Sequence, residues 1–251
     1  MKLHVFVTDI AALLGKNPYK SKEQAILDIL VRNGLKQATP ESTHLRDVSN
    51  NLQSMCAETR GAVLVATSNN EELFERHKQS LIGNLEKIAP VGSLSEPQKA
   101  QVIQQCLSET NCLCGTIAES SIVKAFEQMC HCAVRGRGRR VFVEGSCWKL
   151  SGRIDGIAVS EGDSPRLIEC KRRKSHFFVP EYDLIQIKCY LGMLRFTKAP
   201  ICPDRGILVQ ALFRDQIVLD YSCEISCDAE WFQGICRVLD DIFTNLNNHM
   251  E

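Results

Sequence analysis

Residues 151–173, "SGRIDGIAVSEGDSPRLIECKRR", decide the fold that we expect for this chain. Two apolar, strand-like segments are separated by the turn-like "SEGDSP", which indicates a hairpin. Asp155 precedes "GIAV" and Glu169 follows "LI", so a hairpin of this length places both carboxylates at one end of a sheet. Lys171 is two residues beyond Glu169 and shares its face of the strand.

The chemistry of these three side chains suits a metal-assisted reaction. Charges set among apolar residues are costly unless they are paired. Carboxylates with water suit a hard cation such as Mg²⁺ (or Mn²⁺), which would polarise a phosphodiester oxygen and lower the pKa of a bound water. Lys171 could orient that water and offset charge in the transition state. The alternative is an ion pair between neighbouring strands, worth roughly 0–1 kcal/mol.

Composition indicates a soluble globular protein. The 251 residues are 44% hydrophobic and 24% charged, with a formal net charge of zero. We expect no membrane span and no signal peptide, because no apolar run is long enough and the N-terminus lacks a cleavage-site pattern. The 13 scattered cysteines favour a reducing, intracellular compartment with mostly free thiols. A zinc or iron–sulfur site at "CLCGT" (112–116) and "CHC" (130–132) is the alternative, although the downstream cysteines lack CxxC spacing.

The order of the expected elements predicts one α/β (α+β) domain with a mixed central sheet flanked by helices and a helical N-terminal extension. We divide it into a mostly helical region, 1–110, packed in one continuous domain on a core, 111–251. A loop is expected within 35–70. Helices are predicted at 8–19, 21–34, 69–88, 96–109, 115–130, 181–196 and 227–249. Strands are predicted at 139–145, 148–159, 166–173, 205–213 and 216–222.

Three further motifs accompany the two acids and the lysine. "GTIAES" (115–120) contains the pattern GxxxE, whose acid is Glu119. The alternative is that Glu119 is an ordinary acid on the solvated face of a helix. "QIKCY" (186–190) places Gln186 and Tyr190 on one helix face. The alternative is that they are a polar pair that partly covers the packing face of the helix. The third is "TDIAALLGKNPYKS", at residues 8–21.

Together and in this order, the motifs resemble the PD-(D/E)xK nuclease superfamily, and within it the lambda-exonuclease-like or YqaJ-like viral recombinase (alkaline exonuclease) family. Ile154 stands where the signature usually has proline. The resemblance implies a restriction-endonuclease-like core in which Gln186 and Tyr190 brace the site and Lys171 acts on the water. The metal ligands that it implies are Glu119, Asp155, Glu169 and the Cys170 backbone carbonyl.

The resemblance also implies an activity. The implied activity is Mg²⁺-dependent 5′-to-3′ digestion of double-stranded DNA ends by an exonuclease, in viral or phage recombination. A single-strand annealing or binding protein, a homotrimer, and a location in the host cytoplasm or nucleus follow from the same resemblance. The alternatives are a structure-specific or nicking endonuclease with the same site, and an inactive DNA-binding module with the same fold.

DNA contacts must come from local basic clusters, since the net charge is zero. The clusters "RGRGRR" (135–140) and "KRRK" (171–174) predict backbone contacts, although the first could also be a nuclear-localisation-like patch or a solvated turn. The predicted DNA-binding residues are Arg135, Arg137, Arg139, Arg140, Arg172 and Arg173. The resemblance also implies a 5′-phosphate pocket, for which Lys20, Ser21 and Arg153 are candidates.

Overall fold

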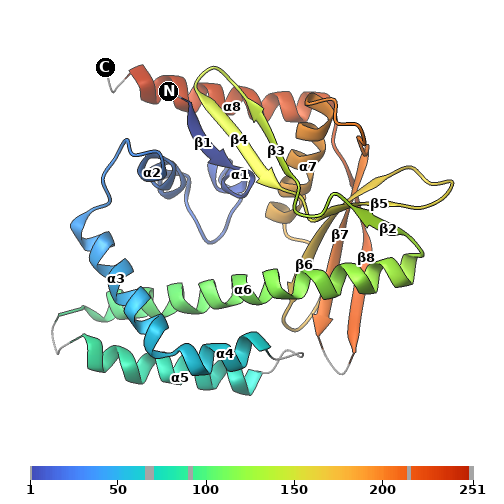
Figure 1. The fold of residues 1–251 in the computed structure, drawn as a ribbon. Helices are drawn as coiled ribbons and strands as arrows, with labels where there is room; N and C mark the ends of the chain where they lie inside the picture. Colours follow the sequence, from blue (N-terminus) through green and yellow to red (C-terminus); the bar gives the residue numbers. More distant parts are fainter. Residues whose placement is uncertain (1, 66–70, 90–92, 214–215, 249–251) are drawn as a thin grey trace.

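The chain folds into an α+β structure with two mixed sheets (Figure 1). The computed structural model describes residues 2–65, 71–89, 93–213 and 216–248. Its helices are α1 (Val7–Leu13), α2 (Lys22–Arg32), α3 (Pro40–Met55), α4 (Ala57–Val65), α5 (Glu71–Ile88), α6 (Glu96–Cys130), α7 (Glu181–Phe196) and α8 (Ala229–Asn248). Its strands are β1 (Leu3–Phe6), β2 (Ala133–Arg135), β3 (Arg140–Glu144), β4 (Trp148–Arg153), β5 (Gly156–Val159), β6 (Arg166–Arg173), β7 (Arg205–Phe213) and β8 (Ile217–Ser226). The predicted fold class is confirmed.

The larger sheet has the strand order β2-β5-β6-β7-β8. β6 and β7 run parallel, and the other neighbours pair antiparallel. A parallel pair needs a crossover connection, which α7 provides. Phe126 of α6 clusters with Ile168 and Val209, whereas Ile187 of α7 belongs to the cluster that contains Leu167. Successive residues of β6 therefore face different helices, as the pleat of a strand requires.

The smaller sheet has the order β1-β4-β3 and packs against α1, α7 and α8. Trp148 of β4 is fully buried, and its Nε1–H donates a 2.7 Å hydrogen bond to Asp240 Oδ1 of α8. Sequence did not predict β1, because four residues are too few to establish an alternating pattern. β1 is a strand through its parallel pairing with β4, a segment far away in the chain.

The segment 148–159, predicted as one strand, is divided between the two sheets. β4 belongs to the smaller sheet and β5 to the larger. Between them lies Ile154, which is fully buried, donates its N–H to Arg139 O at 3.1 Å and accepts from Gly138 N at 2.9 Å. An apolar pattern continues through such a junction because both halves are strand-like. Asp155 consequently lies where the chain passes from one sheet to the other.

Helices α3, α4, α5 and the first part of α6 form a unit with its own apolar cluster, which includes Leu52, Leu81, Leu85 and Val102. Most of the expected loop within 35–70 is in fact helical, and residues 66–70 lie outside the described part.

Helix α3 begins inside the polar stretch that suggested a loop. Thr39 is its N-cap and accepts a 3.1 Å hydrogen bond from Ser42 N, and Pro40 occupies the first helical position. Both residue types favour a helix start, so "TPES" is a capping signal rather than a loop signal.

The helices predicted at 96–109 and 115–130 are one continuous helix, α6, which connects the helical unit to the larger sheet (Figure 1). Gly115 does not interrupt it, because a glycine within a helix costs only about 1 kcal/mol relative to alanine. α6 also runs across the boundary between 110 and 111, and the division of the chain at that position stays a prediction.

The helix predicted at 8–19 ends at Leu13. Gly15 and Gly34 follow α1 and α2 with positive φ angles of 69° and 72°. Asp9 is an acid in the first turn of α1. It lies three residues after the cap, where its Oδ2 accepts from Phe6 N at 3.0 Å. The first two residues of the helix predicted at 69–88 and the last of that predicted at 227–249 lie outside the described residues.

All 13 cysteines lie in the described part of the chain, and none of them is in a disulfide. Among the described helices, none is both long enough and apolar enough to cross a membrane.

Candidate active site

Asp155 and Glu169 are placed side by side by the antiparallel pairing of β5 with β6. Gly156 is opposite Ile168 in this ladder, so the two acids occupy the next position beyond its end. Asp155 Oδ2 accepts a 2.7 Å hydrogen bond from the backbone N–H of Cys170. The backbone of β6 therefore holds the first carboxylate next to the second.

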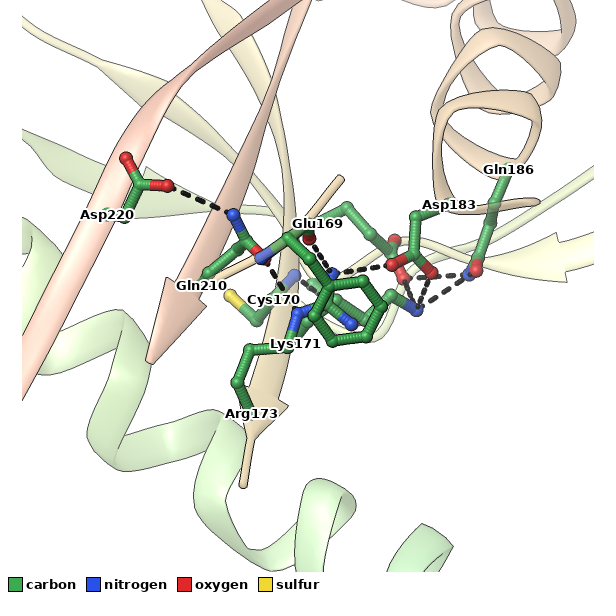
Figure 2. Close-up of polar contacts among 10 residues, drawn as sticks. Glu169, Cys170, Lys171, Arg173, Asp183, Gln186, Gln210 and Asp220 are labelled. Carbon is green, nitrogen blue, oxygen red and sulfur yellow. Dashed lines mark hydrogen bonds and ion pairs between the residues drawn. The ribbon is translucent and has the colours of Figure 1, made fainter. Parts of the chain in front are cut away.

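Glu169, Lys171 and Gln186 form a closed triangle of hydrogen bonds (Figure 2). Lys171 Nζ donates to Glu169 Oε1 at 2.8 Å and to Gln186 Oε1 at 3.0 Å. Gln186 Nε2 donates to Glu169 Oε1 at 2.7 Å. Glu169 and Lys171 share the face of β6 that α7 covers, so the strand and the helix together set the triangle.

Tyr190 lies one turn beyond Gln186 on α7 and is buried. Its ring packs against Gly152 so closely that a Cβ there would be 2.5 Å from Tyr190 Cε1 and 2.9 Å from its hydroxyl oxygen. Burial raises the pKa of the Tyr190 hydroxyl, and the Gln186 side chain acts in the opposite direction. Tyr190 therefore stays a neutral phenol at neutral pH, packed one turn beyond Gln186.

One oxygen of the buried Glu169 carboxylate has no partner. Glu169 is 3% exposed, and its Oε2 has no hydrogen-bond partner among the described residues. A buried polar atom left unsatisfied costs roughly 1–3 kcal/mol. A cation bound to this oxygen would remove that cost, and oxygen donors are those that Mg²⁺ prefers.

The electrostatics of Asp155 and Glu169 also favour a bound cation. Burial, and then the charge of Glu169, raise the pKa of Asp155 to about 8. Burial also raises the pKa of Glu169, against the effect of Lys171. Burial alone would lower the pKa of Lys171, but the carboxylates of Glu169 and Asp183 raise it, so its ammonium stays charged. The crowded carboxylates lack sufficient positive charge, and a divalent cation would supply it.

Glu119 projects from α6 and is not part of the triangle. Its charge contributes to the raised pKa values of Asp155 and Glu169, yet its nearest cationic partner is Arg137, with Nη2 4.0 Å from Glu119 Oε1. Over the described residues, no group of three or more His, Cys, Asp or Glu side chains is arranged to hold a metal ion. A metal at Asp155 and Glu169 would therefore take its other ligands from water, from the backbone or from a repositioned Glu119.

Cys170 lies between the two motif residues, and its thiol packs against the cluster beneath α6. Burial raises the pKa of this thiol, so it is a packing group rather than a thiolate ligand. Only its backbone is directed to the site, through the hydrogen bond to Asp155.

The arginine loop, residues 135–140, lies next to the Asp155 junction. Its four arginines are exposed, and so is Arg153, which pairs with Arg140 across β3 and β4. Gly136 and Gly138 have φ angles of 65° and 67°, a conformation that favours glycine. Arg137 Nη2 also donates to Ser120 Oγ at 2.9 Å, so the loop is connected to α6 beside Glu119.

The second basic cluster does not present all of its charges to solvent. Arg173 is 7% exposed, with its guanidinium 2.7 Å from Asp183 Oδ2 and its Nε donating to Gln210 Oε1 at 2.7 Å. β6 turns this residue into the core, so the structure gives no support to the predicted phosphate contact of Arg173. Arg172 is partly buried and stacks over Phe213.

Lys20 and Ser21 lie at the start of α2, and both have partners within the chain. Lys20 Nζ is 2.8 Å from Asp28 Oδ2 and 3.4 Å from Asp9 Oδ1, and Ser21 Oγ accepts from Gln24 N at 3.2 Å. Ser21 thus caps the helix, as its spacing to Gln24 predicts.

Asp183 is the site residue that sequence reasoning missed. It is 2% exposed in the first turn of α7, 3.5 Å from Lys171 and 2.7 Å from Arg173. An acid in a first helical turn has an ordinary explanation in the helix dipole. The one available signal was its position three residues before Gln186, on the same face of the helix.

No family model matches the chain, and a search of the curated proteins finds no match either. Several solved structures are similar to it, including the following two. A protein from Eubacterium rectale named "Putative exonuclease" is 10% identical, over 94% of this chain and 80% of its own, with a TM-score of 0.38. The protein SSO0001 is 19% identical, over 58% of this chain and 67% of its own, also with a TM-score of 0.38. Likenesses at this level carry no argument about activity, so function must be argued from the site.

Proposed function

We propose that this protein is a metal-dependent deoxyribonuclease whose site is centred on Asp155, Glu169 and Lys171. The observation that carries the proposal is the pair of crowded acids, one with an unpartnered buried oxygen, beside a fixed ammonium. Most buried polar atoms in proteins are hydrogen-bonded. Gln53 Oε1 and Arg60 Nε are also buried without a partner among the described residues, but Glu169 Oε2 is the one that lies in a carboxylate beside a second acid and an ammonium. A site that awaits a cation has a reason to leave one open.

In this proposal Asp155 and Glu169 hold Mg²⁺ or Mn²⁺. Mg²⁺ is commonly bound through one or two carboxylates and keeps several waters, so two acids are sufficient. When bound, the metal would polarise a phosphodiester oxygen and lower the pKa of a bound water. Lys171 orients the attacking water and offsets charge on the phosphate, and Gln186 holds Lys171 against Glu169. The ligand roles of Glu119 and the Cys170 carbonyl rest on the sequence resemblance alone.

The narrower proposals rest on the same resemblance. They are 5′-to-3′ digestion of duplex ends in viral or phage recombination, an annealing partner and a trimer. The exposed arginine loop beside Asp155 supports a substrate with a phosphate backbone, because arginine forks match phosphate oxygens. Nothing in the loop selects ends over internal sites, so an endonuclease with the same site is the competing proposal.

The test is digestion of a linear duplex, labelled separately at each 5′ and 3′ end, with Mg²⁺ or with EDTA. A closed circular duplex is the second substrate. Lys171→Met removes the ammonium but keeps the length of the side chain, and Lys99→Met on the surface of α6 is the control. Early release of the 5′ label, with the circle intact and Lys171→Met inactive, supports the exonuclease.

Cutting of the circle would instead support the endonuclease. Binding without any cutting, by a folded wild-type protein with Mg²⁺ or Mn²⁺, would overturn the nuclease proposal in favour of a DNA-binding module.

A further inference from the structure

Asp183 contacts the two cations of β6 that face α7. Its Oδ1 is 3.5 Å from Lys171 Nζ, and its Oδ2 is 2.7 Å from Arg173 Nη2 (Figure 2). It lies in the first turn of α7, where the helix dipole favours a negative charge. Only 2% of the Asp183 surface is exposed, so water competes little for these contacts.

Arg173 is held on its other side by groups that do not belong to the site. Its Nε donates to Gln210 Oε1 at 2.7 Å, and its Nη2 donates to Phe178 O at 3.1 Å. Gln210 is fully buried on β7 and donates in turn to Asp220 Oδ2 of β8 at 3.0 Å. The guanidinium is thereby fixed by β7, which β8 supports through Gln210, and by the segment that precedes α7.

This arrangement is a costly way to stabilise a core. Replacing a buried ion pair by apolar residues is often neutral or stabilising, and in some proteins such pairs serve to fix one arrangement of the chain instead. Here the arrangement ends on the Lys171 ammonium, which has oxygens of Glu169, Gln186 and Asp183 around it. Gln186 and Asp183 are not candidate metal ligands, so their contacts with the ammonium do not depend on whether Glu169 binds a metal.

We propose that Asp183, held by Arg173, is a positioning residue for Lys171. The proposal rests on the proposed function, because it states how the reactive lysine of that site is held. Removing the Asp183 charge should leave the Lys171 ammonium mobile beside Glu169, and a displacement of about 1 Å in a reacting group can slow a reaction by 10²-fold.

Two readouts test the proposal, and the first does not require activity. In protein labelled with ¹⁵N-lysine, a held ammonium gives a resolved Nζ signal that exchanges slowly with water. The Lys171 signal, identified by its loss in Lys171→Met, should disappear in Asp183→Asn. It should persist in Glu181→Gln, which removes an exposed acid from the same helical turn. A Lys171 signal that persists in Asp183→Asn would overturn the proposal.

The second readout is cleavage kinetics. Asp183→Asn should lower kcat by about tenfold to a hundredfold, with KM for DNA within about twofold. The reason is that the substitution changes the position of Lys171 and leaves the proposed DNA contacts in place. Asp183→Glu should recover part of the loss. A raised KM with unchanged kcat, or a lost Lys171 signal with unchanged kcat, would overturn the positioning role.

Asp183→Asn leaves the Arg173 charge buried without its partner, and the variant could fail to fold. Asp183→Asn combined with Arg173→Gln removes both charges, and it should show the same loss of the Lys171 signal and of kcat. If the wild-type protein cuts no DNA, the proposed function fails, and the ¹⁵N signal still decides whether Asp183 holds Lys171.

Discussion

Asp155 accepts a 2.7 Å hydrogen bond from the backbone N–H of Cys170, the residue between Glu169 and Lys171. The bond joins the junction between the two sheets to the strand that carries the second acid and the lysine. The Asp155 carboxylate is therefore fixed to the backbone of the strand that carries Glu169, while the side chains of Lys171 and Gln186 hold the Glu169 carboxylate. A site held in this way is organised before any ligand arrives, which is the arrangement that electrostatic catalysis requires.

Mg²⁺ should stabilise the folded protein. A ligand that binds only the folded state adds about 2.7 kcal/mol when its concentration is 100 times its Kd, which raises Tm. Asp155→Asn should abolish this rise in a thermal melt. Asp163→Asn, in the exposed turn between β5 and β6, should retain it. An equal rise in all three proteins would place the Mg²⁺ elsewhere.

The stability of the metal-free protein should fall as pH rises. The pKa of Asp155 is about 8 in the folded state against an ordinary value of 3.8, so only the folded state holds this proton between those values. The free energy of unfolding should therefore fall from about pH 4 to about pH 8, by up to roughly 1.4 kcal/mol per unit. Urea melts in EDTA should show that Asp155→Asn lowers this slope. An identical slope in the variant would contradict the raised pKa.

Gly152→Ala should destabilise the protein. The added Cβ would lie 2.5 Å from the Tyr190 ring and 3.0 Å from Val7, in a packed interior where overpacking costs about 1–3 kcal/mol. Gly83→Ala is the control, because it lies within α5 with nothing within 4 Å of a Cβ. That change should stabilise α5 by roughly 0.5–1 kcal/mol. Chemical denaturation measures both, and a neutral Gly152→Ala would mean that Tyr190 can move away.

The arginine loop should contribute to DNA affinity in a salt-dependent way. The slope of log K against log salt is about −0.9 for each phosphate that a protein neutralises, so changing Arg135, Arg139 and Arg140 to Gln should reduce its magnitude by about 3 if each arginine binds one phosphate. Duplex titrations at several salt concentrations measure this slope. Arg76→Gln, on the surface of α5, should leave it unchanged. A loop variant with the wild-type slope would remove the loop from the interface.

Arg173→Gln should act on stability and not on DNA binding. It leaves the Asp183 carboxylate buried without its main partner, a loss that typically costs about 3–5 kcal/mol. Thermal melts should show a large fall in Tm. Duplex affinity, measured at a temperature where the variant is folded, should stay within about twofold, in contrast to the arginine loop variant. Loss of affinity in a folded Arg173→Gln protein would restore it as a DNA contact.

Much of the fold could be predicted from local sequence. β6, β7 and α7 are long or strongly patterned segments, and the predictions for them match the structure, whereas the strand predicted at 216–222 ends four residues before β8 does. The misses involve two kinds of element. β1, β2 and the division of 148–159 depend on which strands pair across the chain, and α3 was hidden by polar residues that serve as a helix cap.

The candidate site divides in the same way. The order of the motifs and the alternation of side chains along β6 were enough to select Asp155, Glu169, Lys171 and Gln186. Sequence assigned Arg173 to the DNA contacts, because "KRRK" is a dense basic run. Only the packing of α7 on that face of the sheet buries it against Asp183.

By itself, the sequence determined the elements with regular periodicity and the residue types that suit a metal and a phosphate. Both follow from local rules, since backbone pattern and side-chain chemistry belong to neighbouring residues. The tertiary structure alone decided the division of β4 from β5 at Asp155, the unpartnered oxygen of Glu169, and the contact of Asp183 with Lys171 and Arg173. Those features arise where segments distant in the chain pack together, and burial in that packing changes the cost of every charge.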